Sequence, residues 1–352
     1  MQTVAITGVA TVLGQRVLAG LDQAGAGRII GIDSRLSQLR PHGFEQLVAD
    51  LRTATDAELA GALEEADTLV HLAWPQGSPR DPSPANVDRT RRLLAVASGS
   101  PVETIVHVST ATVYGAWPDN AVPLTEEAPL RPNPGFMDAV QRAEAERLFA
   151  DWAAERPGSA VAVLRPVPIL GPGIEGWLVR ALGGAGPVRV GDNDPPRQFV
   201  HAEDVAAAVV RAGADRLDGA FNVTPDGWVD GPTVRDLVAG RPPLPLPTRL
   251  AAPAASWAWA LHLTDVPPEV LPLVVHPWVV ANDRLRAAGW VPRYSNEEAL
   301  VAGRPGSPWR EMSPRRRQEV ALAGAGIALA GATGAVVTAA VRHRRRLRGL
   351  GS

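Results

Sequence analysis

Short apolar runs alternate with helical patterns along the first two hundred residues, and this alternation limits the fold more than any other feature. The runs cover residues 3–7, 28–33, 46–50, 68–72, 104–109 and 160–164, and the helical patterns cover 11–24, 56–65, 84–98 and 137–155. Strands that alternate with helices form right-handed βαβ units, which build a parallel sheet with helices on both faces. The pattern therefore predicts an α/β fold with a doubly wound parallel sheet.

The pattern loosens after Arg165, where Pro- and Gly-rich stretches separate short elements. Such stretches are typical of long insertions between the elements of a lobe. We therefore expect a first domain over residues 1–165, completed by 197–223, and a smaller C-terminal substrate lobe over 166–300. Residues 301–319 are expected to form a linker.

An uncharged stretch of 22 residues, 320–341, lies between two groups of arginines near the C-terminus. A helix of this length can span a bilayer. The stretch therefore predicts a C-terminal hydrophobic transmembrane helix, followed by a basic tail over 342–352, that anchors a cytoplasmic body to the membrane. The alternatives are a soluble helix docked on the body and a disordered basic tail. We expect no signal peptide ahead of the first strand.

The chain has no cysteine and no lysine, so that its 35 positively charged Lys or Arg positions are all arginine. This composition excludes disulfides, cysteine-bound metals and every lysine-dependent mechanism, and the scattered histidines predict no metal site. Residues 1–300 carry 25 Arg against 35 acidic residues, whereas residues 301–352 carry 10 Arg against two acidic residues. The acidic body argues against nucleic acid as a partner, and the basic tail suits an anionic membrane face.

The first apolar run leads into a glycine-containing turn, in "VAITGVATVLG". Thr7 and Gly8 end the predicted strand and Gly14 lies in the following helix, whose first N–H groups and dipole favour a pyrophosphate. Asp33 ends the next predicted strand, at the spacing where an acid binds the 2′-hydroxyl of a ribose. The turn therefore predicts a dinucleotide site in a Rossmann-type sheet. The alternative is a strand, turn and helix that bind no ligand.

An ordered series of motifs extends over residues 2–295. It consists of "TGVATVLG", "GIDSR", "ADLR", "HLAW", "ANVDRT", "VSTATVYG", "LRPVPILGPG", "RQFVHAEDVAAAV", "FNV" and "LRAAGWVP". With these motifs the chain resembles the NAD-dependent epimerase/dehydratase branch of the extended short-chain dehydrogenase/reductase family, typified by UDP-galactose 4-epimerase. The resemblance implies NAD as cofactor and dinucleotide-binding positions at Thr7, Gly8, Thr11, Val12, Gly14, Asp33, Arg35, Asp50, Leu51, Leu72, Ala73 and Asn86.

The fingerprint departs from the family at Thr11, where the family has its middle glycine. That glycine lets the backbone approach the pyrophosphate. The Thr11 side chain is expected to push the phosphates outward and so lower the affinity, although its hydroxyl can donate a hydrogen bond to them. Asp33 favours NAD over NADP because a carboxylate repels a 2′-phosphate, whereas Arg35 and Arg52 leave NADP open as the alternative.

The catalytic motif is degenerate. In the family, a tyrosine acidified by a lysine four residues later moves the proton, and a Ser or Thr completes the hydrogen bonds. The resemblance places Thr110 at the Ser/Thr position and aligns "FMDAVQRAE" with the family's YxxxKxxxE, so that Phe136 and Val140 replace the tyrosine and the lysine. Because the chain has no lysine, no other alignment restores the pair.

The resemblance implies substrate-type positions at Tyr114, Arg165 and Arg197, since the family holds a nucleotide-sugar pyrophosphate with side chains of this kind. Tyr114 is either a packing residue or a substitute acid. Arg197 either contacts a ligand or forms a salt bridge to Glu203 or Asp204.

Several other residues are expected to have structural rather than functional roles. His107 lies inside an apolar run and is expected to be a hydrogen-bonded core histidine rather than a base. Asp138, Asp151 and Glu155 are expected on a solvated helix face. Trp257 and Trp259 are expected in the core of the second lobe rather than in a platform for a sugar.

Two functions follow from these residues. The first is an NAD-dependent epimerase/dehydratase-like protein that binds the dinucleotide without tyrosine–lysine chemistry and acts as a cofactor-binding sensor or scaffold at the membrane. The second is an active oxidoreductase or epimerase that acts on a nucleotide sugar or a related small molecule, in which Thr110, Tyr114 or water handles the proton. The missing pair favours the first, and the otherwise complete motifs favour the second.

Overall fold

The computed structural model describes residues 1–75, 80, 85–174, 181, 188–190, 194–238 and 244–303. The chain divides into two compact units, Met1–Gly303 and Arg304–Ser352, and all described residues belong to the first. Within them, no helix is long and apolar enough to cross a membrane. The predicted hydrophobic helix at 320–341, the basic tail and all but three residues of the predicted linker lie outside the described residues.

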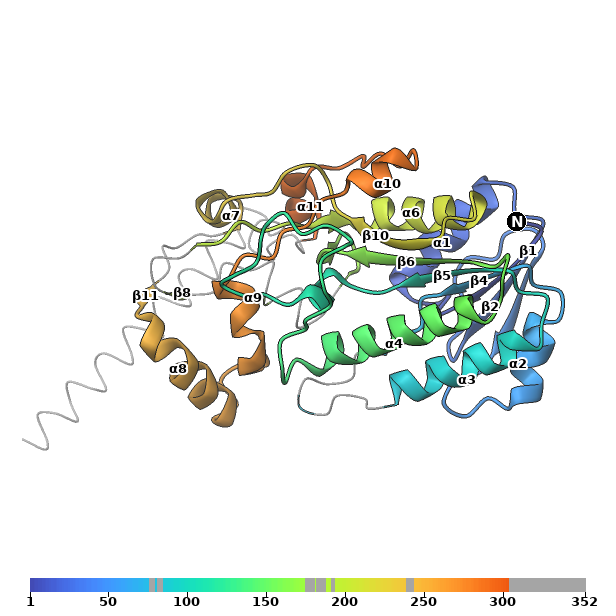
Figure 1. Ribbon diagram of the computed structural model, residues 1–352, viewed down its shortest axis with the longest axis horizontal. Helices are drawn as coiled ribbons and strands as arrows, with labels where there is room; N and C mark the ends of the chain where they lie inside the picture. Colours follow the sequence, from blue (N-terminus) through green and yellow to red (C-terminus); the bar gives the residue numbers. More distant parts are fainter. Residues whose placement is uncertain are drawn as a thin grey trace, which may run out of the picture. The chain divides into compact units, whose positions relative to one another are not determined.

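A seven-stranded parallel sheet forms the centre of the first unit (Figure 1). Its strand order is β10-β6-β5-β4-β1-β2-β3, so that the order reverses between β1 and β4, as in dinucleotide-binding sheets. The predicted doubly wound parallel sheet is confirmed. The strands are β1 (Thr3–Thr7), β2 (Arg28–Asp33), β3 (Phe44–Val48), β4 (Thr68–His71), β5 (Thr104–Val108), β6 (Ala160–Pro166) and β10 (Gly219–Val223).

Helices cover both faces of this sheet (Figure 1). One face carries α1 (Val12–Gln23) and α6 (Ala202–Ala214), and the other carries α2 (Asp56–Leu63), α3 (Asn86–Ser98) and α4 (Met137–Ala154). Alternate residues of β1 supply the two layers, since Val4 and Ile6 belong to the cluster that includes α1 and α6, whereas Ala5 belongs to the cluster with α3 and α4.

Most of the described elements after Pro166 are short. Two small two-stranded sheets pair β7 (Ile169–Leu170) with β9 (Val200–His201) and β8 (Val188–Val190) with β11 (Leu244–Leu246). The remaining helices among the described residues are α7 (Gly231–Val238), α8 (Thr248–Ala260), α9 (Leu271–Val275), α10 (Asp283–Ala287) and α11 (Asn296–Ala302), with 3-10 turns η1 (Ala111–Tyr114) and η2 (Pro268–Val270). The predicted domain boundary near Arg165 stays a prediction.

Candidate dinucleotide-binding site

The turn between β1 and α1 depends on two glycines for its shape. Gly8 has a φ of +77°, and a Cβ atom there would lie 2.9 Å from the amide nitrogen of Ala73. A Cβ atom on Gly14 would lie 2.2 Å from the carbonyl oxygen of Gly8. Glycine at position 14 therefore lets the first turn of α1 approach the end of β1. Glycine at position 8 lets the β1–α1 turn approach the end of β4.

Thr11 caps α1. Its hydroxyl donates to the carbonyl oxygen of Gly8 at 2.8 Å and accepts from the amide of Gly14 at 3.0 Å. The hydroxyl proton is thus used within the turn, and a hydrogen bond from Thr11 to a phosphate stays a prediction. The first intrahelical bond runs from the amide of Gln15 to the carbonyl of Thr11, so that the amides of Val12 and Leu13 precede it. Amides in this position, together with the helix dipole, stabilise an anion.

Asp33 ends β2 beside the same turn. One carboxylate oxygen accepts from the amide of Ala10 and the other from the amide of Arg35, each at 3.0 Å. These two bonds fix the carboxylate between the end of β2 and the start of α1. The carboxyl ends of β1 and β2 thereby present an anion-binding helix terminus and a fixed carboxylate side by side.

The end of β4 completes this part of the site. The amide of Leu72 donates to the carbonyl of Thr7 at 3.2 Å, and the amide of Ala73 donates to the Thr7 hydroxyl at 3.3 Å. That hydroxyl also bonds Nδ1 of His71 at 2.7 Å. The structure therefore brings Thr7, Gly8, Leu72 and Ala73 together, although they come from two strands.

The other predicted cofactor positions bond to near neighbours. Asp50 follows β3 and pairs with Arg52 at 2.6 Å, and this hydrogen bond lowers the pKa of the Asp50 carboxyl. Leu51 packs against the cluster around β2. Asn86 is buried at the start of α3, where its amide nitrogen donates to the carbonyl of Pro75 and its oxygen accepts from Arg89.

The predicted catalytic position holds an apolar wall. Phe136 is the N-cap residue of α4, only 3% exposed, and it packs in the core cluster with Ala139. Val140 lies one helical turn later and is half-buried. Thr110 caps η1 by accepting from the amide of Thr112 at 3.3 Å. Neither Phe136 nor Val140 has a proton to exchange.

A polar cluster near these residues was not predicted from the sequence. The indole nitrogen of Trp74 donates to Asp138 at 2.9 Å, and Arg142 pairs with the other oxygen of Asp138 at 3.1 Å. The Arg142 guanidinium also lies 4.6 Å over the Trp74 ring and donates to the carbonyl of Val108. The expectation that Asp138 lies on a solvated face is wrong, because its side chain is only 15% exposed. The cluster bonds the first two turns of α4 to the chain that follows β4.

Tyr114 and Arg165 bond to each other in a buried network. Arg165 donates to the Tyr114 hydroxyl at 2.7 Å and pairs with Glu146 at 2.7 Å. The Tyr114 hydroxyl donates in turn to Asn222 at 2.8 Å. Burial raises the pKa of Tyr114 to about 12. Arg165 lies within β6 rather than in the loop after it, and the polar ends of both side chains are held by protein partners.

His107 is buried, but the expected hydrogen bond is missing. Neither of its ring nitrogens has a hydrogen-bond partner among the described residues. Its ring stacks on His71 at 5.4 Å and on Phe149 at 4.4 Å between centroids. Burial lowers the pKa of His107 well below 6.5 and that of His71 to about 4. Both imidazoles are therefore neutral at physiological pH.

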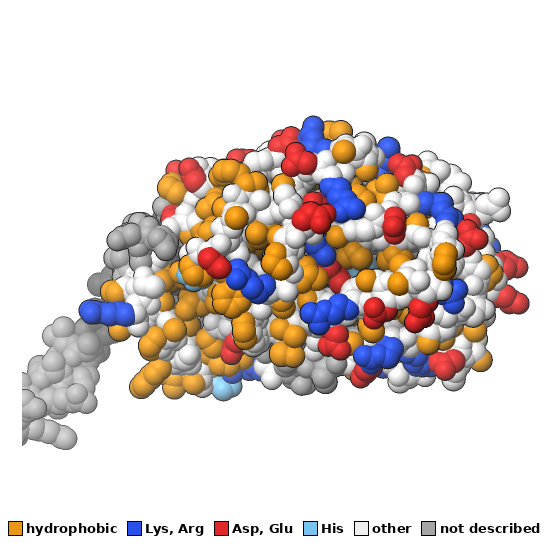
Figure 2. Space-filling model, in the orientation of Figure 1, with side chains coloured by type: hydrophobic (Ala, Val, Ile, Leu, Met, Phe, Trp, Pro, Cys, Tyr) orange, Lys and Arg blue, Asp and Glu red, His pale blue; other side chains and the backbone are white. Residues whose placement is uncertain are grey.

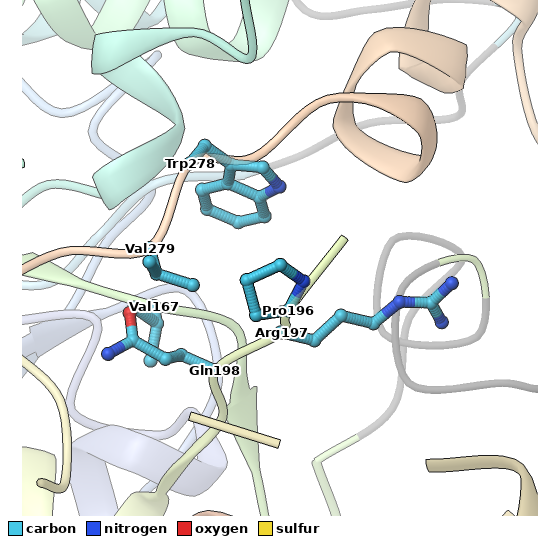
Figure 3. Close-up of a pocket in the computed structure, with 6 residues that line it drawn as sticks. All are labelled: Val167, Pro196, Arg197, Gln198, Trp278 and Val279. Atoms are coloured by element: carbon cyan, nitrogen blue, oxygen red, sulfur yellow. The ribbon is translucent and has the colours of Figure 1, made fainter. Parts of the chain in front are cut away.

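Arg197 lines a small cleft beside Trp278. In Figure 3 its guanidinium points away from the Trp278 ring that covers the cleft, whose other lining residues are Val167, Pro196, Gln198 and Val279. Its backbone pairs with that of Val229. The acids proposed as its salt-bridge partners have other bonds, since Glu203 pairs with Arg16 and Asp204 accepts from two backbone amides.

The sequence model of the NAD dependent epimerase/dehydratase family matches residues 4–224. This chain belongs to that family. NAD is the cofactor of the family, as the sequence predicted. An uncharacterized protein of Mycobacterium tuberculosis is 29% identical over 315 residues, which cover 85% of this chain and 82% of that protein. The UDP-glucose 4-epimerase of Mycolicibacterium smegmatis is 29% identical over 247 residues, or 62% of this chain and 75% of the epimerase.

Solved structures share the fold. The Thermus thermophilus UDP-glucose 4-epimerase in complex with NAD superposes with a TM-score of 0.64 at 21% identity. The superposition covers 86% of this chain and 97% of that structure. The similarity extends well beyond the seven-stranded sheet, because the shared part includes most of the described residues after β6.

Proposed function

We propose that the chain binds NAD(H) at the carboxyl ends of β1, β2 and β4 but does not run the tyrosine–lysine chemistry of its family, and acts instead as a cofactor-binding sensor or scaffold. One observation carries the proposal: the glycine cradle formed by Gly8 and Gly14 beside the fixed Asp33 is built on the same sheet as α4, where the apolar Phe136 and Val140 stand at the positions of the family's tyrosine and lysine. The chain thus has the residues that would bind the cofactor, but it lacks the tyrosine and the lysine that move the proton in the family.

The cradle fits a dinucleotide. The amides of Val12 and Leu13 would hold the pyrophosphate, and Asp33 would accept from a ribose hydroxyl. When bound, NAD supplies a hydride acceptor at its nicotinamide ring. Because Asp33 would repel a 2′-phosphate, we propose NAD rather than NADP as the ligand.

The proton is the missing part. Phe136 and Val140 offer none, and the Tyr114 hydroxyl is held between Arg165 and Asn222 with a pKa of about 12. A phenol with so high a pKa is a weak general acid and, at neutral pH, almost never a base. Only the Thr110 hydroxyl or water is then left to move the proton. The motif that contains Phe136 and Val140 supplies Thr110 with no ionisable partner for this step.

An active oxidoreductase or epimerase is the second candidate. The relatedness to a UDP-glucose 4-epimerase supports it and favours a nucleotide sugar as the second ligand. The two candidates differ in turnover and not in NAD binding, so that one assay separates them.

The test measures NADH formation and epimerisation with UDP-glucose and UDP-galactose, on wild-type protein and on a variant that carries Phe136→Tyr and Val140→Lys. We expect no turnover in the wild type and measurable turnover in the double variant, with Val140→Lys alone as the control. Wild-type turnover of about 10 per second, an ordinary enzymatic rate, would contradict the proposal.

We also propose that residues 320–341 anchor a cytoplasmic body to the membrane. The uncharged length and the flanking arginines support this. The full chain should remain with membranes in a high-salt wash, whereas a version that ends at Pro314 should not. Full-length protein released by salt would show that only the arginines hold it.

A further inference from the structure

Helix α8 presents an apolar surface that no described residue covers. Only Ala251 of this helix is buried. Leu250 is 47% exposed, Trp257 71%, Leu261 61% and Leu263 76%. We call these four side chains the α8 patch, and Figure 2 shows hydrophobic side chains gathered over α8 and α9. The expectation that Trp257 lies in a core is wrong. Exposed apolar patches of this kind mark interaction sites.

Three side chains of the patch follow one stripe of the helix, and Leu263 lies just beyond its end. Leu250, Ala254, Trp257 and Leu261 recur at spacings of four, three and four residues, which places them on one face. An ordinary surface helix turns its larger apolar residues to the core and its charges to water. In α8 this arrangement is reversed, because the outward stripe carries the tryptophan and leucines and the packed side carries alanines.

Trp259, two residues from Trp257, has a different environment. The guanidinium of Arg80 lies 3.7 Å over its ring, and Arg80 also donates to the carbonyl oxygens of Trp259 and Thr264. These bonds hold the C-terminal end of α8 against the chain that precedes α3. The helix is therefore fixed with Trp257 turned outward.

Charge indicates which partner the patch fits. No acidic residue occurs from 237 to 264, a stretch that contains Arg241 and Arg249. Tryptophan and leucine beside cationic residues, without acids, are typical of helices that lie in the headgroup layer of an anionic bilayer. A second copy docked through the same patch would bring like charges together.

The remainder of the chain points to the same partner. The part beyond Gly303 contains the uncharged stretch at 320–341, and residues 301–352 carry 10 Arg against two acids. We propose that the α8 patch inserts into the headgroup layer of an anionic membrane, so that the body contacts the bilayer directly rather than only through a tether.

The absence of cysteine allows a sharp test. Leu263→Cys creates a single labelling site in the full chain, and Val291→Cys is the matched control. Val291 is 64% exposed and follows α10 in the chain. Helix α10 lies far from α8 in Figure 1. Each variant is labelled with an environment-sensitive fluorophore and mixed with vesicles of phosphatidylcholine and phosphatidylserine. Sedimentation reports vesicle binding, and iodide quenching reports exposure of the label.

With vesicles, we expect the emission of the label at position 263 to shift to shorter wavelength and its iodide quenching to fall several-fold. The label at 291 should not change. Adding Trp257→Glu and Leu261→Glu should restore quenching at 263. Protein that sediments while the label at 263 stays accessible would overturn the proposal, as would a failure to sediment. Protection of the label at 263 from iodide without vesicles would also overturn the proposal. Protection that does not depend on protein concentration would indicate that the chain's own C-terminal segment covers the patch. Protection that increases with protein concentration would indicate that a second copy covers it.

Discussion

Acid should destabilise this protein through two buried histidines. His71 and His107 occupy paired positions on β4 and β5 and are each 1% exposed. Burial lowers the pKa of His71 to about 4 and that of His107 well below 6.5. The folded protein therefore keeps both rings neutral at pH values where the unfolded chain takes up a proton on each.

The size of the effect follows from these pKa values. In the unfolded chain a histidine takes up its proton as the pH falls through about 6.5. Stability is therefore complete above that pH and is lost progressively below it, until the folded pKa is reached. One pKa unit corresponds to about 1.4 kcal/mol, so that at about pH 5 His71 should lower the free energy of unfolding by about 2 kcal/mol. His107 acts in the same direction, and its contribution at this pH is at most about 2 kcal/mol, because the unfolded pKa of about 6.5 sets that limit.

His107→Phe isolates one of these contributions, since a phenyl ring can stack on Phe149 in the same way without taking up a proton. Urea unfolding of wild type and variant is measured near neutral pH and at about pH 5. We expect the free energy of unfolding to fall less in the variant than in the wild type between the two conditions, by up to about 2 kcal/mol. Any packing cost of the new ring is present at both pH values, and the carboxylates titrate alike in both proteins. An equal loss in the two proteins would refute the reasoning.

Two further predictions use matched variants. Gly8→Ala should weaken NAD binding by about tenfold or more, which is about 1.4 kcal/mol. The control is Gly25→Ala, because Gly25 has a similar φ of +75° but no atom within 4 Å of the new Cβ, and it should change the affinity by less than about twofold. Calorimetry measures both affinities, and equal losses would show that backbone strain alone is responsible. Glu146→Gln should lower the free energy of unfolding by about 3 kcal/mol or more, because it leaves the buried Arg165 without its carboxylate. The exposed Glu144→Gln on the same helix should cost less than about 1 kcal/mol in the same urea titration, and similar costs at both positions would contradict a buried ion pair.

The layers of the fold could be predicted because strand and helix periodicities are local. The predicted bounds of β1 and β2 agree with the structure, since the inner residues of both strands form apolar runs that polar residues bound at each end. Strand β3 begins two residues earlier than predicted. It is an edge strand with no fully buried residue, and its register is set by pairing Ile29 with Phe44. Periodicity alone does not determine that pairing.

The partners of polar side chains could not be predicted in the same way. The Tyr114–Asn222 bond joins residues 108 positions apart, and the Trp74–Asp138 bond joins residues 64 apart. Nothing local distinguishes such residues from solvated ones. The outward Trp257 was missed for a related reason, because the rule that apolar residues are buried works in one direction only.

The central claim is that the cradle beside Asp33 binds NAD(H). Its most direct test is calorimetric titration of the purified full chain with NAD, NADH and NADPH, together with Asp33→Ala and, as a control of equal charge change, Asp22→Ala at the far end of α1. We predict binding of NAD(H) by the wild type and Asp22→Ala, and affinity lowered by about tenfold in Asp33→Ala. No binding of any of these dinucleotides by the wild type at about 1 mM, which corresponds to about 4 kcal/mol, would contradict the claim.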